Sequence, residues 1–226
     1  MKMMLALLLV ASAAPVETLF DSGMFTEGPA AAPDGSIYFS DITASARSRE
    51  AGHIWRYDPR TGETRVYRSP SGMANGLAFD ARGRLIAAEG ADRGGRRLTR
   101  TDMTTGRSEV LASSYDGRPL NSPNDLAIDA RGRIYFSDPR YVGDEPVEQP
   151  VEGVYRIDTD LSLHLIIAGV PKPNGLAISP DQKTLYVAST EGTASILAYD
   201  LSAEGTVSGR RLFVAFGKGE YADGLT

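Results

Sequence analysis

Cysteine is absent from the 226 residues of the chain. Without a thiol, the protein has no cysteine nucleophile, disulfide, zinc finger or iron–sulfur cluster. Charge of one sign is not concentrated either, because 24 Lys and Arg are interspersed with 29 Asp and Glu, for a formal net charge of −5. The sequence therefore has no basic surface for nucleic acid and no polybasic membrane anchor, and it gives no sign of an oligomeric state.

Long hydrophobic runs are scarce, and the most prominent one lies at the N-terminus. Residues 1–15 read MKMMLALLLVASAAP, with one Lys, an apolar run and an Ala-Ser-Ala cleavage pattern. This run is too short to span a bilayer. We expect residues 1–13 to be an export signal, so that the protein is periplasmic or secreted. The alternative is a buried first strand or a misassigned start, and the protein would then be cytoplasmic.

A regularly spaced set of short motifs is the strongest feature that is present. A polar residue followed by Gly or Asp, and then by an apolar residue or Pro, occurs at Glu27, Asn75, Asn124, Asn174 and Asp223. Successive motifs are 48, 49, 50 and 49 residues apart. A near-constant step of this size indicates a repeat architecture.

Within each repeat, short apolar runs alternate with turn residues. The second repeat reads GLAFD, the turn ARGR, LIAAE, RRLTRTD, the turn MTTGR and SEVLAS. β-Branched and aromatic residues with frequent Gly, Asp and Pro turns favour strands over helices. Four strands joined by hairpin turns are typical of one blade of a β-propeller, so we expect an all-β fold. WD-repeat signatures are missing, and Trp55 is expected to pack in the core of a third strand.

Four segments together resemble one protein family. They are FTEGPAAAPDGSIYFSDI (25–42), NGLAFDARGRLIAAEG (75–90), LNSPNDLAIDARGRIYFSDPRY (120–141) and PNGLAISPDQKTLYVAS (173–189). In this order they resemble the senescence marker protein / gluconolactonase / luciferin-regenerating enzyme family of six-bladed β-propellers, and its bacterial gluconolactonases most closely. The resemblance runs from about residue 17 to the C-terminus.

Six blades would need more chain than is present. Four repeats are complete, whereas only Asp223–Thr226 of a fifth follows, and six repeats of this size require roughly 320 residues. We expect residues 14–226 to form a single β-propeller domain that is incomplete at its C-terminus and folds or acts poorly alone. Residues 16–22 are suited to completing a last blade.

The resemblance implies one divalent cation, usually Ca²⁺, at the top of the central channel. By motif, its ligands are Glu27, Asn124, Asn174 and Asp223, although in some members the Asn of SPND contacts the substrate instead. The residues agree, because equivalent positions in radially arranged blades converge on one axis. Two carboxylates and two amide oxygens suit Ca²⁺ or Mg²⁺ and disfavour zinc or copper. The alternative is that these pairs only form turns.

Four further side chains are expected to contact a polar substrate. Asn75 holds the same ring position in the second blade, Asn121 and Ser122 precede Asn124, and Tyr141 closes the SDPRY segment. A turn or backbone role is the alternative for each. In some animal relatives an Arg occupies the position of Ser122, so their preference for sugar acids does not carry over.

The expected reaction is metal-dependent hydrolysis of a lactone such as a sugar lactone. A cation polarises the carbonyl and makes a nearby water more acidic. Asp223 is the expected general base, because a ligand carboxylate can keep one oxygen free, and Glu27 balances the charge of the ion. The alternatives are a phosphotriester hydrolase of the same propeller type and a non-catalytic, calcium-stabilised binding propeller.

Other chemistry-bearing residues are expected to be structural. His53 and His164 fall in outer strands, which excludes a His-based triad. The pair at 94–95 belongs to a hairpin loop rather than a phosphate cradle. A solvated loop is expected for the Arg cluster at residues 93–97. The loop at 142–149 is expected to cap the channel or to be disordered.

Overall fold

The protein is described here by a computed structural model covering residues 17–42 and 52–226, and its strands form four four-stranded antiparallel sheets and one two-stranded sheet. The first sheet contains β1 (Thr26–Ala31), β2 (Ile37–Asp41), β3 (His53–Asp58) and β4 (Glu63–Arg68). The second contains β5 (Ala74–Phe79), β6 (Leu85–Glu89), β7 (Arg97–Thr101) and β8 (Ser108–Ala112). The third contains β11 (Leu126–Ile128), β12 (Ile134–Asp138), β13 (Gly153–Ile157) and β14 (Leu163–Ala168). The fourth contains β15 (Pro173–Ile178), β16 (Thr184–Ser189), β17 (Ser195–Leu201) and β18 (Val207–Ala215), and the short strands β9 (Ser114–Tyr115) and β10 (Arg118–Pro119) pair with each other.

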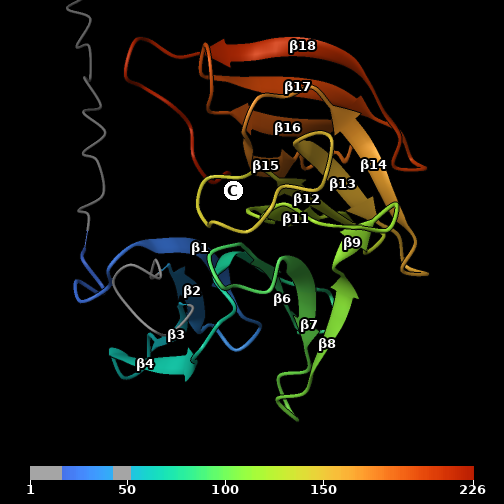
Figure 1. Cartoon of the computed structure of the whole chain (residues 1–226). Helices are drawn as coiled ribbons and strands as arrows, with labels where there is room; N and C mark the ends of the chain where they lie inside the picture. Colours follow the sequence, from blue (N-terminus) through green and yellow to red (C-terminus); the bar gives the residue numbers. More distant parts are fainter. Residues whose placement is uncertain (1–16, 43–51) are drawn as a thin grey trace, which may run out of the picture.

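The four large sheets are the blades of a propeller. In each, the strands follow one another in chain order as a meander. The first strands β1, β5, β11 and β15 gather toward the middle, and β4, β8, β14 and β18 lie at the periphery (Figure 1). After β18 the chain returns toward the middle, where it ends (Figure 1). The all-β fold with four complete blades is therefore confirmed.

Repeated turn sequences set the hairpins within the blades. The sequence DARGR occurs twice, beginning at Asp80 and at Asp129. In the first copy, the backbone N–H of Asp80 donates to the carbonyl of Arg84, and the Asp80 carboxylate accepts the N–H of Arg84. Gly83 and Gly132 have φ values of 71° and 82°, a conformation that favours glycine. The sequence therefore fixes the β5–β6 and β11–β12 turns locally.

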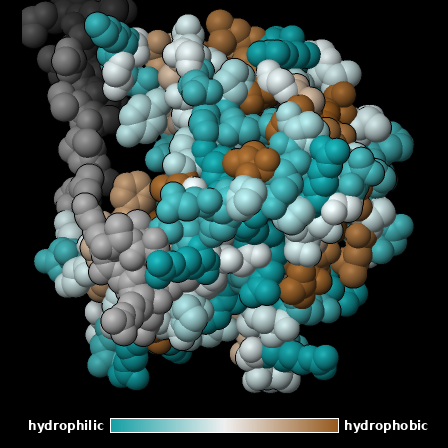
Figure 2. Space-filling view, in the orientation of Figure 1, coloured by the Kyte–Doolittle hydropathy of each residue, from teal (hydrophilic) through white to brown (hydrophobic). Residues whose placement is uncertain are grey.

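Apolar side chains fill the spaces between neighbouring blades. Tyr38, Ile54, Leu77 and Leu85 pack between the first two blades; Leu98, Phe136 and Tyr155 between the second and third; Tyr135, Leu176 and Val187 between the third and fourth. The surface in Figure 2 is mostly hydrophilic, with apolar residues in small separate groups. The blades thus share their cores, and each depends on its neighbour for burial.

The N-terminal part of the described chain packs on the first blade. Residues 17–25 contain no strand. The Phe20 ring lies 5.4 Å from the Phe39 ring and 4.8 Å from the Trp55 ring, measured between centroids. Trp55 is partly buried there, with its indole N–H bonded to Asp41. The described residues of the segment proposed to complete a last blade therefore pack against the first blade.

The predicted export signal at residues 1–13 lies outside the described residues and stays a prediction, as does the single domain spanning 14–226. Within the part of the chain that the structure describes, no helix has the length and apolarity needed to cross a membrane.

Truncating the shared core should cost far more stability than truncating the outer edge. Leu98 is fully buried between the second and third blades, whereas Leu212 on β18 is 62% exposed. We expect Leu98→Ala to lower the free energy of unfolding by about 2–5 kcal/mol. The matched Leu212→Ala should change it by less than about 0.5 kcal/mol. Chemical denaturation measures both, and equal losses would contradict a shared core between these blades.

Candidate active site

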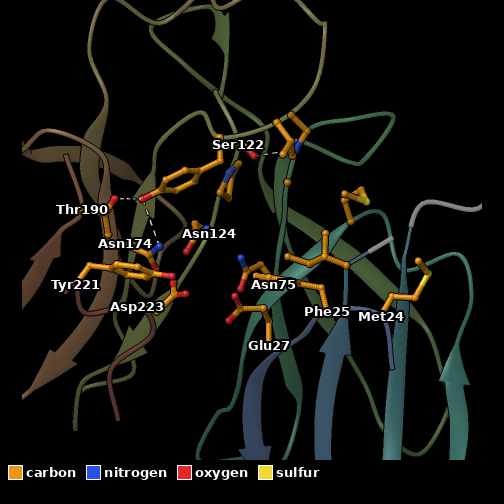
Figure 3. Close-up of a pocket in the computed structure, with 17 residues that line it drawn as sticks. Met24, Phe25, Glu27, Asn75, Ser122, Asn124, Asn174, Thr190, Tyr221 and Asp223 are labelled. Carbon is orange, nitrogen blue, oxygen red and sulfur yellow. Dashed lines mark hydrogen bonds between the residues drawn. The ribbon is translucent and has the colours of Figure 1, made fainter. Parts of the chain in front are cut away.

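Five polar side chains from five successive repeats surround one pocket. Glu27, Asn75, Asn124, Asn174 and Asp223 all line a cavity of about 550 Å³. Glu27 and Asn75 face Asn174 and Asp223 across this space, with Asn124 between the two sides (Figure 3). The structure thus brings together the first positions of all five repeats, which are up to 196 residues apart in the sequence.

Close contact between neighbouring inner segments explains the glycine in these motifs. The N–H of Gly76 donates to the carbonyl of Asn124 at 2.7 Å, and the N–H of Gly175 donates to the carbonyl of Asp223 at 3.1 Å. A Cβ atom on Gly76 would lie 2.8 Å from the Asn124 oxygen, and one on Gly175 would lie 2.2 Å from the Asp223 oxygen. Any side chain would push the segments apart. The polar-Gly pair is therefore a junction between blades as well as a turn.

Asp125 is the exception at this glycine position, and its side chain forms a second kind of junction. Its carboxylate accepts the N–H of Leu176 at 2.9 Å and that of Leu225 at 3.4 Å, so it connects the third blade to the fourth and to the C-terminal segment. Burial raises the pKa of Asp125 to about 6, although the N–H donors of Leu176, Leu126 and Leu225 oppose the shift. Asp125 is not among the site residues predicted from the sequence. The sequence does mark it, because Asp125 is the only second residue among the five motifs that is not glycine.

Three carboxylates give the pocket floor its electrostatic character. Burial raises the pKa of Glu27 to about 7, and repulsion from Asp223 and Asp125 adds to the shift. No Arg, Lys or His stands among the described residues that line the pocket. A cation near Glu27 and Asp223 would relieve this repulsion.

The donor set determines which ion this floor fits. Within residues 17–42 and 52–226, no three His, Cys, Asp or Glu side chains converge to hold an ion by themselves. The amide oxygens of Asn124 and Asn174 would therefore have to complete a site with Glu27 and Asp223. An all-oxygen set of this kind suits a hard cation such as Ca²⁺.

Tyr141 orients the amide of Asn174. The Asn174 side-chain N–H donates to the Tyr141 hydroxyl at 3.3 Å, and that hydroxyl lies 2.5 Å from the Thr190 hydroxyl (Figure 3). Tyr141 also donates to the carbonyl of Lys172 at 3.2 Å. Because the amide nitrogen is held in this way, the carbonyl oxygen of Asn174 is the atom left to meet a ligand.

Two aspartates position loops that lead to the ring of polar residues, which is formed by Glu27, Asn75, Asn124, Asn174 and Asp223. Asp138 accepts the N–H groups of Asn121 and Ser122 at 2.8 and 2.7 Å. Asp41 accepts those of Met24 and Phe25 at 3.0 and 2.9 Å. Each Asp ends a second strand, and in both cases the amides lie three and two residues before the ring residue. Neither aspartate is among the site residues predicted from the sequence, although the identical pentapeptide IYFSD at 37–41 and 134–138 marks both.

Three of the four expected substrate contacts line the pocket, namely Asn75, Ser122 and Tyr141. Asn121 does not. It is completely buried, and its side-chain amide donates to the carbonyls of Asp138 and Val151 at 3.2 and 3.1 Å. Asn121 therefore holds the loop that carries Ser122.

The two histidines and the glycine pair lie where the sequence places them, outside the pocket lining. His53 opens β3 and bonds to Ser69, and His164 lies in β14 beside Asp158. Gly94 and Gly95 lie in the loop between β6 and β7.

The prediction of a solvated arginine loop is wrong for two residues. Arg96 donates to the carbonyl of Leu120 and pairs with Glu148, at 2.7 and 2.6 Å. Arg97 pairs with the buried carboxylate of Glu89 at 2.7 Å. The buried Glu89 carboxylate and the Leu120 carbonyl both need hydrogen-bond donors, and the two guanidinium groups supply them.

The loop at 142–149 is ordered and lies at the pocket rim. Glu145 accepts the backbone N–H groups of Asp92 and Arg93 at 3.2 and 2.6 Å, and Gln149 donates to the carbonyls of Tyr115 and Arg118. Val142 lines the pocket. These contacts favour the cap for this loop.

Comparison with known proteins gives a consistent match. Residues 25–226 match the family model of the SMP-30/Gluconolactonase/LRE-like region. The chain is 31% identical over 231 aligned residues to a gluconolactonase from Zymomonas mobilis, covering 93% of this chain and 62% of the relative. It is 30% identical over 201 residues to a pentonolactonase from Haloferax volcanii, covering 83% of this chain and 57% of the relative. The solved structure of a gluconolactonase from Xanthomonas campestris superposes with a TM-score of 0.80 at 32% identity, covering 92% of this chain and 68% of that one. The chain thus spans about 60% of the length of these two curated relatives.

Removing the Asp125 carboxylate should loosen the junction between inner segments. We expect Asp125→Ala to lower the free energy of unfolding by about 1–3 kcal/mol, because the buried N–H of Leu176 loses its acceptor. Asp125→Asn keeps one acceptor oxygen and should lose less. Denaturation curves measure the effect, with Asp144→Asn in the exposed rim loop as control. Unchanged stability in Asp125→Ala would contradict the junction.

Proposed function

The chain belongs to the SMP-30/gluconolactonase/LRE family, and on this premise we propose that it is a cation-dependent lactone hydrolase acting at the pocket around Glu27, Asn124, Asn174 and Asp223. The observation that carries the proposal is the convergence of five oxygen-bearing side chains from five repeats on one pocket. The gluconolactonase and pentonolactonase similarities support the same reaction class.

The residues that would hold the cation are Glu27, Asn124, Asn174 and Asp223. Their two carboxylates match the charge of Ca²⁺, and the Tyr141 contact leaves the Asn174 carbonyl oxygen to serve as a ligand. When bound, the cation would supply positive charge that polarises a lactone carbonyl and makes a nearby water more acidic.

Asp223 is the proposed general base. It is exposed, so water reaches its carboxylate, whereas Glu27 is partly buried. Asp223 would take one proton as the water oxygen bonds to the carbonyl carbon. The ring C–O bond then breaks, the ring oxygen receives that proton, and the product is the open hydroxy acid. Asn75 lies beside Glu27 and offers an amide N–H to the substrate (Figure 3).

Two substitutions separate cation binding from proton transfer. The protein is expressed from its natural reading frame and assayed on δ-lactones and an aryl phosphotriester, with Ca²⁺ or with chelator. We expect Asp223→Asn to lower kcat/KM for lactones by about 100-fold or more, because the base is lost. Glu27→Gln should weaken Ca²⁺ binding by about tenfold, measured by calorimetry, because one ligand charge is removed.

Thermal unfolding supplies a readout that does not depend on activity. Ca²⁺ should raise the Tm of the unaltered protein and of Asp144→Asn, and this rise should shrink in Glu27→Gln. Turnover of the phosphotriester but not of lactones would replace the proposal with the phosphotriesterase alternative. Ca²⁺-dependent stability without turnover of either substrate would leave the binding propeller as the function.

A further inference from the structure

Above its polar floor, the pocket is walled by apolar side chains. Seven apolar side chains line it: Met24, Phe25, Ile42, Met73, Ala91, Pro123 and Val142. Met24 and Phe25 lie on the Glu27 side, and the largely exposed ring of Tyr221 lies on the Asp223 side (Figure 3). They come from the loop before β1, the residue after β2, the turns around β5 and β6, the loop before β11 and the 142–149 loop.

The polar side chains on this wall are already used within the protein. The Ser122 hydroxyl accepts the N–H of Ala91 at 2.9 Å. Tyr141 and Thr190 bond to each other, and both reach the carbonyl of Lys172 at 3.2 Å. Apart from the O–H groups of Ser122 and Tyr221, the described wall offers a ligand no hydroxyl donor that lacks a partner in the protein.

Positive charge is also missing from the described lining. The ammonium of Lys172 lies 5.5 Å from the centre of the Tyr141 ring. That ammonium is bonded to the Glu152 carboxylate at 2.9 Å and to the carbonyl of Arg140. An acidic or phosphorylated substituent on the substrate would therefore meet no free cation on the described wall.

From this wall we propose that the preferred substrates are lactones whose ring carries a hydrocarbon substituent, rather than polyhydroxylated sugar lactones. The inference rests on the proposed function. The carbonyl meets the polar floor, and the substituent packs against Phe25, Met73 and Val142. A sugar hydroxyl that faces Phe25, Met73 or Val142 would leave water without a hydrogen-bond partner, which is unfavourable, whereas a methylene there gains by leaving water.

A matched pair of six-membered lactones tests the preference. D-Glucono-1,5-lactone and an alkyl-substituted δ-valerolactone share the ring and the scissile bond and differ in their substituents. With the protein expressed from its natural reading frame and Ca²⁺ present, we expect kcat/KM to rise by about fourfold per added methylene from methyl to propyl. The propyl lactone should exceed gluconolactone by about tenfold or more. A higher kcat/KM for gluconolactone would overturn the inference and leave lactone hydrolysis standing.

Wall variants locate the preference in the pocket. Phe25 is 57% exposed and Phe213 on β18 is 62% exposed, so both accept polar replacement at similar cost to the fold. We expect Phe25→Ser to reduce the propyl-to-glucono ratio of kcat/KM by about fivefold to tenfold. Phe213→Ser, outside the pocket, should leave the ratio unchanged. Equal ratios in both variants would remove the wall as the cause.

A binding measurement keeps the inference testable if no lactone is hydrolysed. Lactams have the same ring with an amide in place of the ester and resist hydrolysis. Calorimetry should give tighter binding of 6-propyl-2-piperidone than of unsubstituted 2-piperidone, and Phe25→Ser should reduce the difference. Absence of turnover with this binding pattern would reject the proposed reaction and retain the hydrocarbon preference. Equal or weaker binding of the propyl compound would reject the preference itself.

Discussion

The structure depends on contacts between the inner segments of neighbouring blades. At two of these positions a backbone N–H one residue after the polar side chain donates to the carbonyl of the next polar residue, from Gly76 to Asn124 and from Gly175 to Asp223. These contacts are so close that a Cβ atom does not fit. They hold each polar side chain at a defined distance from the axis, so the pocket floor is a direct product of how the blades meet. Where Asp125 interrupts the glycine pattern, its carboxylate supplies the connection instead.

Prediction from the sequence succeeds where the physical cause is local or repeated. The turns at Asp80 and Asp129, the alternating strands and the spacing from Glu27 to Asp223 carry their own signals, and they are sufficient for the blades and the ring. It fails where a partner lies far away in the chain. Leu225 is 100 residues from Asp125, and Glu148 is 52 residues from its partner Arg96. The side chain of Asn121 points away from the pocket because its amide donates to the carbonyls of Asp138 and Val151, and the sequence pattern does not reveal these partners.

The pocket combines two environments that favour different parts of a substrate. Its floor concentrates negative charge, and burial together with repulsion from Asp223 and Asp125 raises the pKa of Glu27. Its wall contributes shape and apolar surface, and the hydroxyls of Tyr141 and Thr190 are bonded within the protein. Floor and wall also arise from different parts of the fold. The floor comes from the repeated ring positions, whereas the wall comes from loops that differ between blades, so specificity can change without disturbing the ring.

The aspartates at the ends of β2 and β12 carry a consequence for how such a protein diversifies. Asp41 and Asp138 hold the backbone of the loop before the ring through main-chain amides alone, so they are indifferent to the side chains of that loop. The loop that Asp41 holds leads to Glu27, and the loop that Asp138 holds leads to Asn124. The pentapeptide thus fixes the backbone of the loop before the ring residue, whichever side chain that residue carries. A duplicated blade inherits the geometry intact and can adopt a new ligand by a single codon change.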